Sequence, residues 1–210
     1  MKNVLLLLPF LLFSANLSAQ TANSTANGSW LNPLNWDCFC VPLPGYTITI
    51  SHAITMDTDF GYTTGSITIS TSGSLIQDAT PRNMAASSNF LNRGTVHFNA
   101  LLINGGTFIN ETTGDLTLNA FTNYSALYNY GAITLDSFYS TNYMNNLGGT
   151  IEVGSFLNSG TFHNSGEIAV DSFYNSGVLN NNGNIDVSTF LTTNQLQNYK
   201  NIHQMLSSSY

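Results

Sequence analysis

Acidic side chains are the residues of this sequence that could hydrolyse a glycosidic bond. Asp136 and Asp171 each follow an apolar strand pattern, Ile-x-Leu before the first and Ile-x-Val before the second. Glycosidases use two carboxylates about 5 to 10 Å apart, and two layers of stacked strands span about 10 Å. Gly154 occupies the same position between them, and no basic residue shares that position. We therefore expect solvated carboxylates here rather than a catalytic pair.

Metal-binding side chains are also sparse. Asp57 and Asp59 form an Asp-x-Asp pair, but calcium takes six or more oxygen ligands. The histidines occupy unrelated positions, so neither a metal cluster nor a Ser-His-Asp arrangement is predicted; they are His52, His97, His163 and His203. We expect no cofactor, no metal and no enzymatic activity.

Cys38 and Cys40 are the two cysteines of the chain. In an exported protein such a pair predicts a disulfide, although a bridge across one residue closes a tight ring. An intrachain bridge, free thiols and an intermolecular bond all stay open. Two cysteines alone do not make a structural zinc site, which takes four ligands. Their spacing also differs from the redox-active C-x-x-C motif.

A fixed repeat positions these side chains. The same residue types recur every 17 residues in the C-terminal half, at Gly149, Gly166 and Gly183, at Ile151, Ile168 and Ile185, at Val153, Val170 and Val187, and at Phe156, Phe173 and Phe190. A period this short is typical of a solenoid. The repeat continues toward the N-terminus with drift, through Leu116, Val96, Ile67 and Ile48. We predict an all-β fold, a single-stranded parallel β-helix of about eight coils of 17–20 residues.

Alternation along each strand assigns residues to the inside of the helix. One predicted inward column contains Phe121, Phe138, Phe156, Phe173 and Phe190, and a second contains Leu127, Met144, Phe162 and Leu179. Asn-Ser-Gly and Asn-Gly segments punctuate the repeat, and both residue types tolerate the left-handed backbone angles of turns. We expect them at the corners of the coil, with Asn158 and Asn175 forming an amide ladder.

Two outward columns could recognise a ligand. The middle of the Ile-x-Val strand gives Thr49, Thr68, His97, Thr117, Thr134, Glu152, Ala169 and Asp186. An ice-binding solenoid would need an unbroken threonine array, which Glu152 and Asp186 interrupt. The position after each column phenylalanine gives Thr122, Tyr139, Leu157, Tyr174 and Leu191, with Leu102 before them. Exposed tyrosine and leucine can stack on sugars or dock a partner, so Tyr139, Leu157, Tyr174 and Leu191 are the predicted ligand-binding residues.

Residues outside the repeat suggest a domain layout. Residues 1–19 combine a basic start, an apolar run of about ten residues and a small residue at the end, the pattern of a cleaved signal peptide. We expect a flexible leader at 20–27, an N-terminal cap rich in Trp and Pro at 28–45, the β-helix at 46–192 and a C-terminal cap or tail at 193–210. In the tail, Leu196, Tyr199 and Ile202 have near-helical spacing, so a short helix competes with an irregular end. The loop 77–93, with Arg82 and Arg93, is the expected insertion.

Charge and hydropathy exclude two classes of partner. The net charge is −7, and removing Lys2 with the signal peptide makes it −8, from 3 basic and 11 acidic residues. Nucleic acids and anionic membranes are bound by clustered Lys and Arg, so we expect neither as a partner. After the signal peptide, no apolar run approaches the roughly 20 residues that span a bilayer.

The N-terminal part of the chain resembles a known kind of module. Gly28-Ser29-Trp30, Asn35-Trp36, Pro42-x-Pro44-Gly45, Thr47–Ile50 and Ile54–Asp57, followed by Gly65–Ile69, are similar to the opening of β-helical modules in secreted and surface proteins of Bacteroidetes. Those proteins occur as adhesins and as carbohydrate-active enzymes, and often carry a C-terminal secretion-sorting domain, which is not found after Phe190. The resemblance implies an extracellular or cell-surface location. It therefore favours a non-catalytic structural or adhesive module that binds glycan or protein, with a polysaccharide lyase or hydrolase as the alternative.

Overall fold

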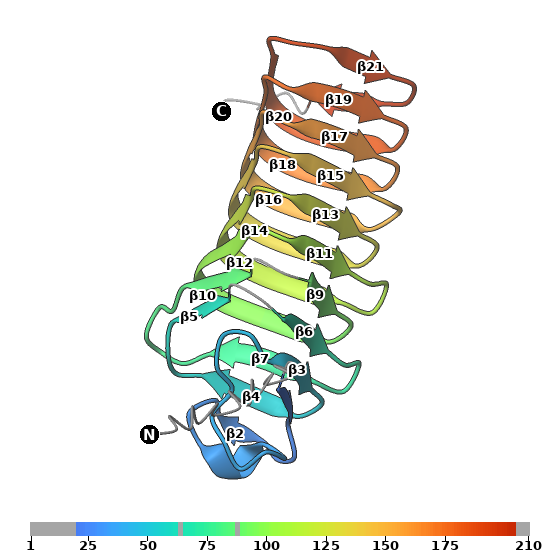
Figure 1. The fold of residues 1–210 in the computed structure, drawn as a ribbon. Coiled ribbons are helices and arrows are strands. Elements are labelled where there is room, and N and C mark those ends of the chain that lie inside the picture. The colour runs from blue at the N-terminus through green and yellow to red at the C-terminus, as the bar shows by residue number, and fades with distance from the viewer. Residues whose placement is uncertain (1–19, 63–64, 87–88, 205–210) are drawn as a thin grey trace, which may run out of the picture.

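A computed structural model describes residues 20–62, 65–86 and 89–204, and the predicted signal peptide at 1–19 lies outside these residues. The chain winds into a stack of parallel strands, so the predicted parallel β-helix is confirmed (Figure 1). Hydrogen bonds join each strand to the equivalent strand of the next coil. Within the described residues, no helix has the length and apolar character needed to cross a membrane.

The strands form two sheets that run the length of the stack. The ten-stranded sheet contains β1 (Thr21–Asn23), β3 (Thr47–Ile50), β6 (Ser66–Ile69), β9 (Asn89–Asn92), β11 (Thr107–Asn110), β13 (Ala126–Asn129), β15 (Tyr143–Asn146), β17 (Thr161–Asn164), β19 (Val178–Asn181) and β21 (Leu196–Asn198). The twelve-stranded sheet contains β2 (Gly28–Ser29), β4 (Ala53–Met56), β5 (Phe60–Tyr62), β7 (Ser74–Gln77), β8 (Met84–Ala86), β10 (Thr95–Asn104), β12 (Asp115–Asn123), β14 (Ala132–Ser140), β16 (Thr150–Asn158), β18 (Glu167–Asn175), β20 (Asn184–Thr192) and β22 (Ile202–Gln204). A short 3-10 helix, η1, spans Pro33–Asn35.

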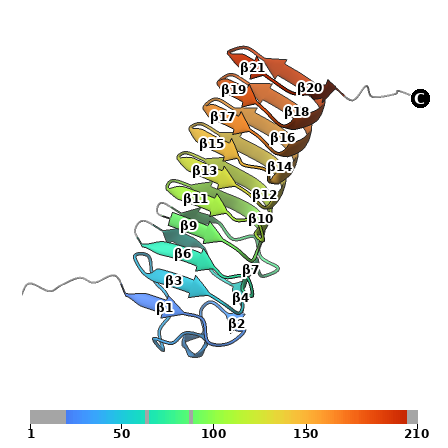
Figure 2. The same ribbon diagram turned by 90° about the vertical axis from the view of Figure 1, so that its right-hand side faces the viewer.

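The long strands of the larger sheet bend once. In β18, Val170 and Phe173 are both buried, while Asp171 and Ser172 between them are both exposed. Two successive outward residues break the alternation of a strand, so the strand turns a corner there. Each coil therefore presents a first face made by the ten-stranded sheet, a second face made by the first half of the long strands, and a third face made by the second half. Figure 2 shows the two sheets on opposite sides of the stack.

Between the ends of the stack, the described chain completes eight coils, which begin at β3, β6, β9, β11, β13, β15, β17 and β19. A short rung precedes them: β1 pairs in parallel with β3, and Ala22 is fully buried. The expectation of a flexible leader at residues 20–27 was therefore wrong. The small polar composition of this segment hides one apolar residue that faces the core.

A second short rung follows the eight coils. The strands β21 and β22 pair with β19 and β20, so the helix expected over Leu196, Tyr199 and Ile202 is not formed. Instead, Leu196 lies above Leu179 and Ile202 above Ile185, in the same register as the preceding coils. Pairing with the exposed edge of the last full coil satisfies backbone groups that an isolated short helix would leave to solvent.

The predicted phenylalanine column fills the third face. Phe121, Phe138, Phe156, Phe173 and Phe190 pair in register from coil to coil. The ring centroids of Phe156 lie 4.8 Å from Phe138 and 4.7 Å from Phe173, with nearly parallel planes. Stacked strands thus place like residues at the spacing that aromatic rings prefer.

The second predicted column lies in the first face. Leu127, Met144, Phe162 and Leu179 are fully buried and in register. Phe108, Phe90, Ile67 and Ile48 continue this column toward the N-terminus. The sequence repeat had aligned Ile48 and Ile67 with the Ile-x-Val strands, which is wrong, because those strands form the second face.

Buried asparagines form two ladders that run along the core. In the first face, each side-chain Nδ2 donates to the Oδ1 of the next coil at 2.8–2.9 Å, through Asn92, Asn110, Asn129, Asn146, Asn164, Asn181 and Asn198. In the third face, Asn158 donates to Asn175 at 2.7 Å, as predicted. Asn104 donates to Asn123 in the same column at 2.7 Å. Repeating the same amide therefore satisfies polar groups that would be costly to bury alone.

The repeated glycines have a different role from the one expected. Within the described residues, positive φ angles occur at Gly28, Gly45, Gly65 and Gly148, and not at Gly166 or Gly183. A Cβ atom at Gly166 would collide with the carbonyl oxygen of Gly149, one coil below, and Gly183 stands in the same relation to Gly166. These positions require glycine because neighbouring coils approach closely there.

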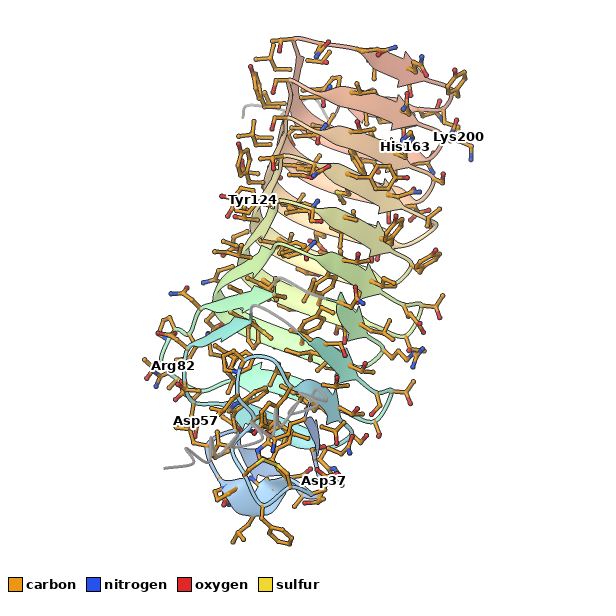
Figure 3. All side chains as sticks on the ribbon, in the orientation of Figure 1. Asp37, Asp57, Arg82, Tyr124, His163 and Lys200 are labelled. Atoms are coloured by element: carbon orange, nitrogen blue, oxygen red, sulfur yellow. A yellow bond between two sulfur atoms is a disulfide. The ribbon has the colours of Figure 1, made fainter. Side chains whose placement is uncertain are left out.

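Two tryptophans cover the N-terminal end of the core. Trp30 and Trp36 are buried, with ring centroids 5.1 Å apart, and Trp36 Nε1 donates to the Trp30 carbonyl at 2.9 Å. Asp37, labelled in Figure 3, accepts from the Asn23 backbone N–H at 2.8 Å and from its Nδ2 at 2.6 Å. Cys38 and Cys40 are joined by a disulfide. The cap is thus tied both to itself and to the first short rung.

The segment 77–93 is not an insertion. It contains β8, which pairs with β5 on one side and with the second half of β10 on the other. The segment therefore completes the third face of its coil. Arg82 lies in the connection before β8 and forms an ion pair with Asp78 at 3.4 Å.

Candidate functional site

The predicted ligand-binding residues form one continuous line on the third face. Because the column phenylalanines point inward, the residue after each one points outward. Tyr139, Leu157, Tyr174 and Leu191 pair in register over four consecutive coils. Their exposed fractions are 36%, 36%, 38% and 53%. We call these four residues the Tyr139 stripe.

The residue that precedes the stripe differs from the one expected. Leu102 is fully buried because it pairs with Phe121 in the inward column. Ile103, the next residue, takes the outward position and pairs with Thr122. The register shift between Phe98 and Leu101 moves the assignment by one residue.

A shallow groove runs beside the stripe. It has a volume of about 310 Å³, and its floor and walls include Leu157, Tyr174 and Leu191. The opposite side is lined by Ser155, Ser172 and Thr189, which pair in register. An apolar line next to a line of hydroxyl groups can bury an apolar surface and hydrogen-bond to a polar one.

The acidic residues do not converge into a catalytic or metal site. Asp136 and Asp171 are exposed at the corner between the second and third faces, with the backbone of Gly154 stacked between them. Asp57 and Asp59 each bind elsewhere: Asp57 Oδ1 accepts from the Leu31 backbone N–H at 3.2 Å, and Asp59 Oδ1 from the Asn83 backbone N–H at 2.8 Å. In the described part of the chain, no three His, Cys, Asp or Glu side chains lie close enough to hold a metal ion.

The predicted threonine column is two separate columns on different faces. Thr49 and Thr68 pair with each other on the first face, and Thr68 is followed there by Leu91. His97, Thr117, Thr134, Glu152, Ala169 and Asp186 form an outward column of the second face. The threonine array that an ice-binding surface would need is therefore shorter than the sequence repeat indicated.

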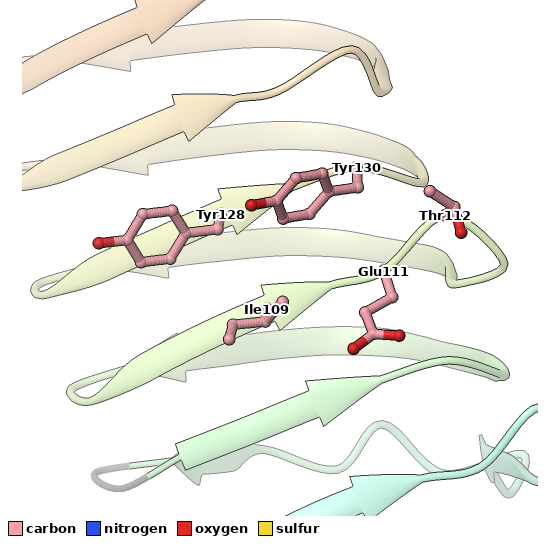
Figure 4. A pocket seen from close by; sticks show the side chains of 5 residues that line it. All are labelled: Ile109, Glu111, Thr112, Tyr128 and Tyr130. Carbon is pink, nitrogen blue, oxygen red and sulfur yellow. The ribbon is translucent and has the colours of Figure 1, made fainter.

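Sequence reasoning missed a hollow on the first face. Ile109, Glu111, Thr112, Tyr128 and Tyr130 line it, and its volume is about 480 Å³. We call it the Tyr128 hollow. Figure 4 shows the two tyrosine side chains on one coil, beside Ile109 and Glu111 of the coil before it. Ile109 and Tyr128 pair directly in register, and Tyr130 is 41% exposed.

The rim of the hollow carries an ion pair. Arg93 Nε donates to Glu111 Oε2 at 2.8 Å, and Arg93 Nη2 donates to Glu111 Oε1 at 3.1 Å. These hydrogen bonds lower the pKa of the Glu111 carboxyl and raise the pKa of the Arg93 guanidinium. The carboxylate therefore stays ionised at neutral pH and shares its charge with Arg93.

A sequence signal for this hollow exists. Leu127 was correctly placed in an inward column, so Tyr128 must point outward and Tyr130 must fall on the same side two residues later. The hollow also needs Ile109 and Glu111, which belong to a coil 19 residues earlier, as the pairing of Ile109 with Tyr128 shows. The sequence repeat had drifted too far at that coil to reveal the pairing.

The chain matches no family model, and neither a curated protein nor a solved structure matches it. Its class therefore follows from the fold and the surfaces alone. It is a parallel β-helix with a closed hydrophobic core, asparagine ladders and two outward-facing aromatic surfaces. A fold of this kind does not by itself define an activity.

Proposed function

We propose that this protein is an exported structural and adhesive module, without catalytic activity, that recognises an extracellular glycan or a surface protein along the Tyr139 stripe. The observation that carries the proposal is the stripe itself, four exposed Tyr and Leu side chains in register on a hydrogen-bonded sheet. Apolar side chains held at fixed spacing by a rigid backbone lose little conformational freedom on binding.

Two features support export. Residues 1–19 have the pattern of a cleaved signal peptide. The Cys38–Cys40 disulfide fits an oxidising compartment, where such bonds persist. An extracellular or cell-surface location follows from the two together.

The absence of catalysis is proposed from the placement of the acids. Asp136 and Asp171 are exposed and lie on separate coils. General acid catalysis by a carboxyl group requires a raised pKa, which burial or a close carboxylate provides. An exposed position on either side of a backbone strand provides neither condition.

A glycan-array screen tests the recognition surface. The secreted protein is compared with a Tyr139→Ala/Tyr174→Ala variant and with a Tyr124→Ala/Tyr199→Ala control, whose tyrosines are exposed elsewhere at 52% and 71%. Circular dichroism must be unchanged in both. Binding that only the stripe variant loses supports glycan recognition by the stripe. Equal binding by all three proteins, or no binding, rejects it and leaves a protein partner as the alternative.

A further inference from the structure

We propose that the Tyr128 hollow is a binding site for a neutral glycan, separate from the Tyr139 stripe. The two surfaces lie on different faces, since the stripe belongs to β14, β16, β18 and β20 and the hollow to the coils of β11 and β13. The inference therefore stands or falls independently of the stripe.

The shape and lining of the hollow fit one or two sugar rings. Small-molecule sites have volumes of about 300 to 1,000 Å³ and combine apolar walls with a few polar groups. The hollow, at about 480 Å³, lies in this range. Ile109 and the rings of Tyr128 and Tyr130 give apolar surface for the C–H faces of a pyranose, and the phenol groups can donate and accept hydrogen bonds.

The charges at the hollow favour a neutral ligand. Glu111 is already paired bidentately with Arg93, so the rim has no net charge to attract a cation. The protein as a whole carries a net charge of −7, which disfavours an anionic polysaccharide. The ion pair still offers carboxylate lone pairs and guanidinium N–H groups to hydroxyls, the polar groups of an uncharged sugar.

Polar and aromatic side chains continue from the hollow along the same face. Tyr128 stands in register with Asn145, His163 and Asn180 on the next three coils. The ring of Tyr143 lies 5.7 Å from that of Tyr128 and 5.6 Å from that of His163, whose position Figure 3 labels. From the Ile109 coil to the Asn180 coil this surface extends about 19 Å, at about 4.8 Å per coil. The geometry therefore suits a glycan chain lying parallel to the helix axis.

Affinity gel electrophoresis tests the proposal with named probes. The purified protein is run through native gels that contain hydroxyethyl cellulose, glucomannan, xylan or glycogen as neutral polysaccharides, with alginate as the anionic comparison. We expect retardation by at least one neutral polysaccharide and none by alginate. The Tyr128→Ala/Tyr130→Ala variant should bind about tenfold more weakly or worse, and the Tyr139→Ala/Tyr174→Ala variant should be retarded like the unmodified protein.

Two further measurements keep the result interpretable. The Tyr128→Phe/Tyr130→Phe variant keeps both rings and should stay retarded, so it tests the stacking surface even if the alanine variant unfolds. Circular dichroism and the urea unfolding midpoint report folding. Mobility unchanged in all four neutral gels, retardation undiminished in a folded Tyr128→Ala/Tyr130→Ala variant, or retardation by alginate alone would each overturn the proposal. Loss of retardation only in the Tyr139→Ala/Tyr174→Ala variant would assign glycan binding to the stripe instead.

Discussion

Ser140 lies directly below Asn158 in the third-face ladder, and the Oδ1 atom of Asn158 is buried without a hydrogen-bond partner among the described residues. Below this point, Asn123 donates to Ser140 Oγ at 3.2 Å. Above it, Asn158 donates to Asn175. The serine is too short to continue the amide ladder, so the ladder is interrupted at this coil.

Replacing the serine should repair the interruption. In Ser140→Asn, the new Nδ2 can donate to Asn158 Oδ1 while the new Oδ1 accepts from Asn123, and we expect a gain of about 1 kcal/mol in the free energy of unfolding. Urea denaturation measures it. The Ser140→Ala variant, which removes the acceptor of Asn123, should be less stable than the unmodified protein. A Ser140→Asn protein as unstable as Ser140→Ala would show that the cavity does not admit the amide.

Breaking the intact first-face ladder should have the opposite effect. Asn129 accepts from Asn110 at 2.9 Å and donates to Asn146 at 2.8 Å. Asn129→Ala leaves buried amide groups unpaired, at a cost of about 1 to 3 kcal/mol for each such group. The exposed Asn182 gives the matched control, since Asn182→Ala should change the unfolding free energy by less than about 0.5 kcal/mol. Equal effects at the two positions would contradict a stabilising ladder.

The phenylalanine column should respond to a loss of volume. Phe156 contacts Phe138, Phe173 and the edge of Phe162. Phe156→Ala should cost about 3 to 5 kcal/mol because the stack cannot close around the cavity, and Phe156→Leu should cost less. Thermal and urea unfolding would reveal the order. If the two variants were equally stable, the column would be loosely packed.

Close approach of the coils predicts intolerance at the stacked glycines. In Gly166→Ala the new methyl group meets the Gly149 carbonyl oxygen, so neighbouring coils must separate. We expect a loss of at least about 1 kcal/mol, as for other overpacked sites. Gly61→Ala is the comparison, because its Cβ would enter open space. Native-state hydrogen exchange at the Gly166 coil locates the damage, and unchanged protection there would count against the proposed contact.

Acid should loosen the N-terminal cap. Hydrogen bonds from Asn23, first from its backbone N–H, lower the pKa of Asp37 in the folded protein. The stabilising contribution of this carboxylate is therefore complete above its unfolded pKa of about 4 and is lost as the pH falls through the lower folded value. Hydrogen exchange of the β1 amides should accelerate in that range, after correction for intrinsic rates. Asp37→Asn should lack this pH dependence, and a variant that keeps it would point to another group.

The 17-residue period was enough to predict the parallel β-helix, both hydrophobic columns and the residues of the Tyr139 stripe. Each of these follows from two regularities: neighbouring coils place equivalent residues one above another, and strands alternate inward and outward residues. Phe156, Phe173 and Phe190 show both clearly. The same logic placed Asn158 above a ladder position, because a buried amide needs an identical partner.

Only the tertiary structure decided which faces the drifting coils contribute to. Ile67 pairs with Phe90, 23 residues later, whereas Phe162 pairs with Leu179, 17 residues later. Because loop length at a corner varies without changing the strands, sequence spacing alone could not separate Thr68 from His97. The Tyr128 hollow escaped detection for the same reason, since Ile109 meets Tyr128 only after the coils have closed. Contacts between coils also determined that Gly166 is needed for close approach and that Leu196 continues the sheet, since both depend on the neighbouring coil rather than on local sequence.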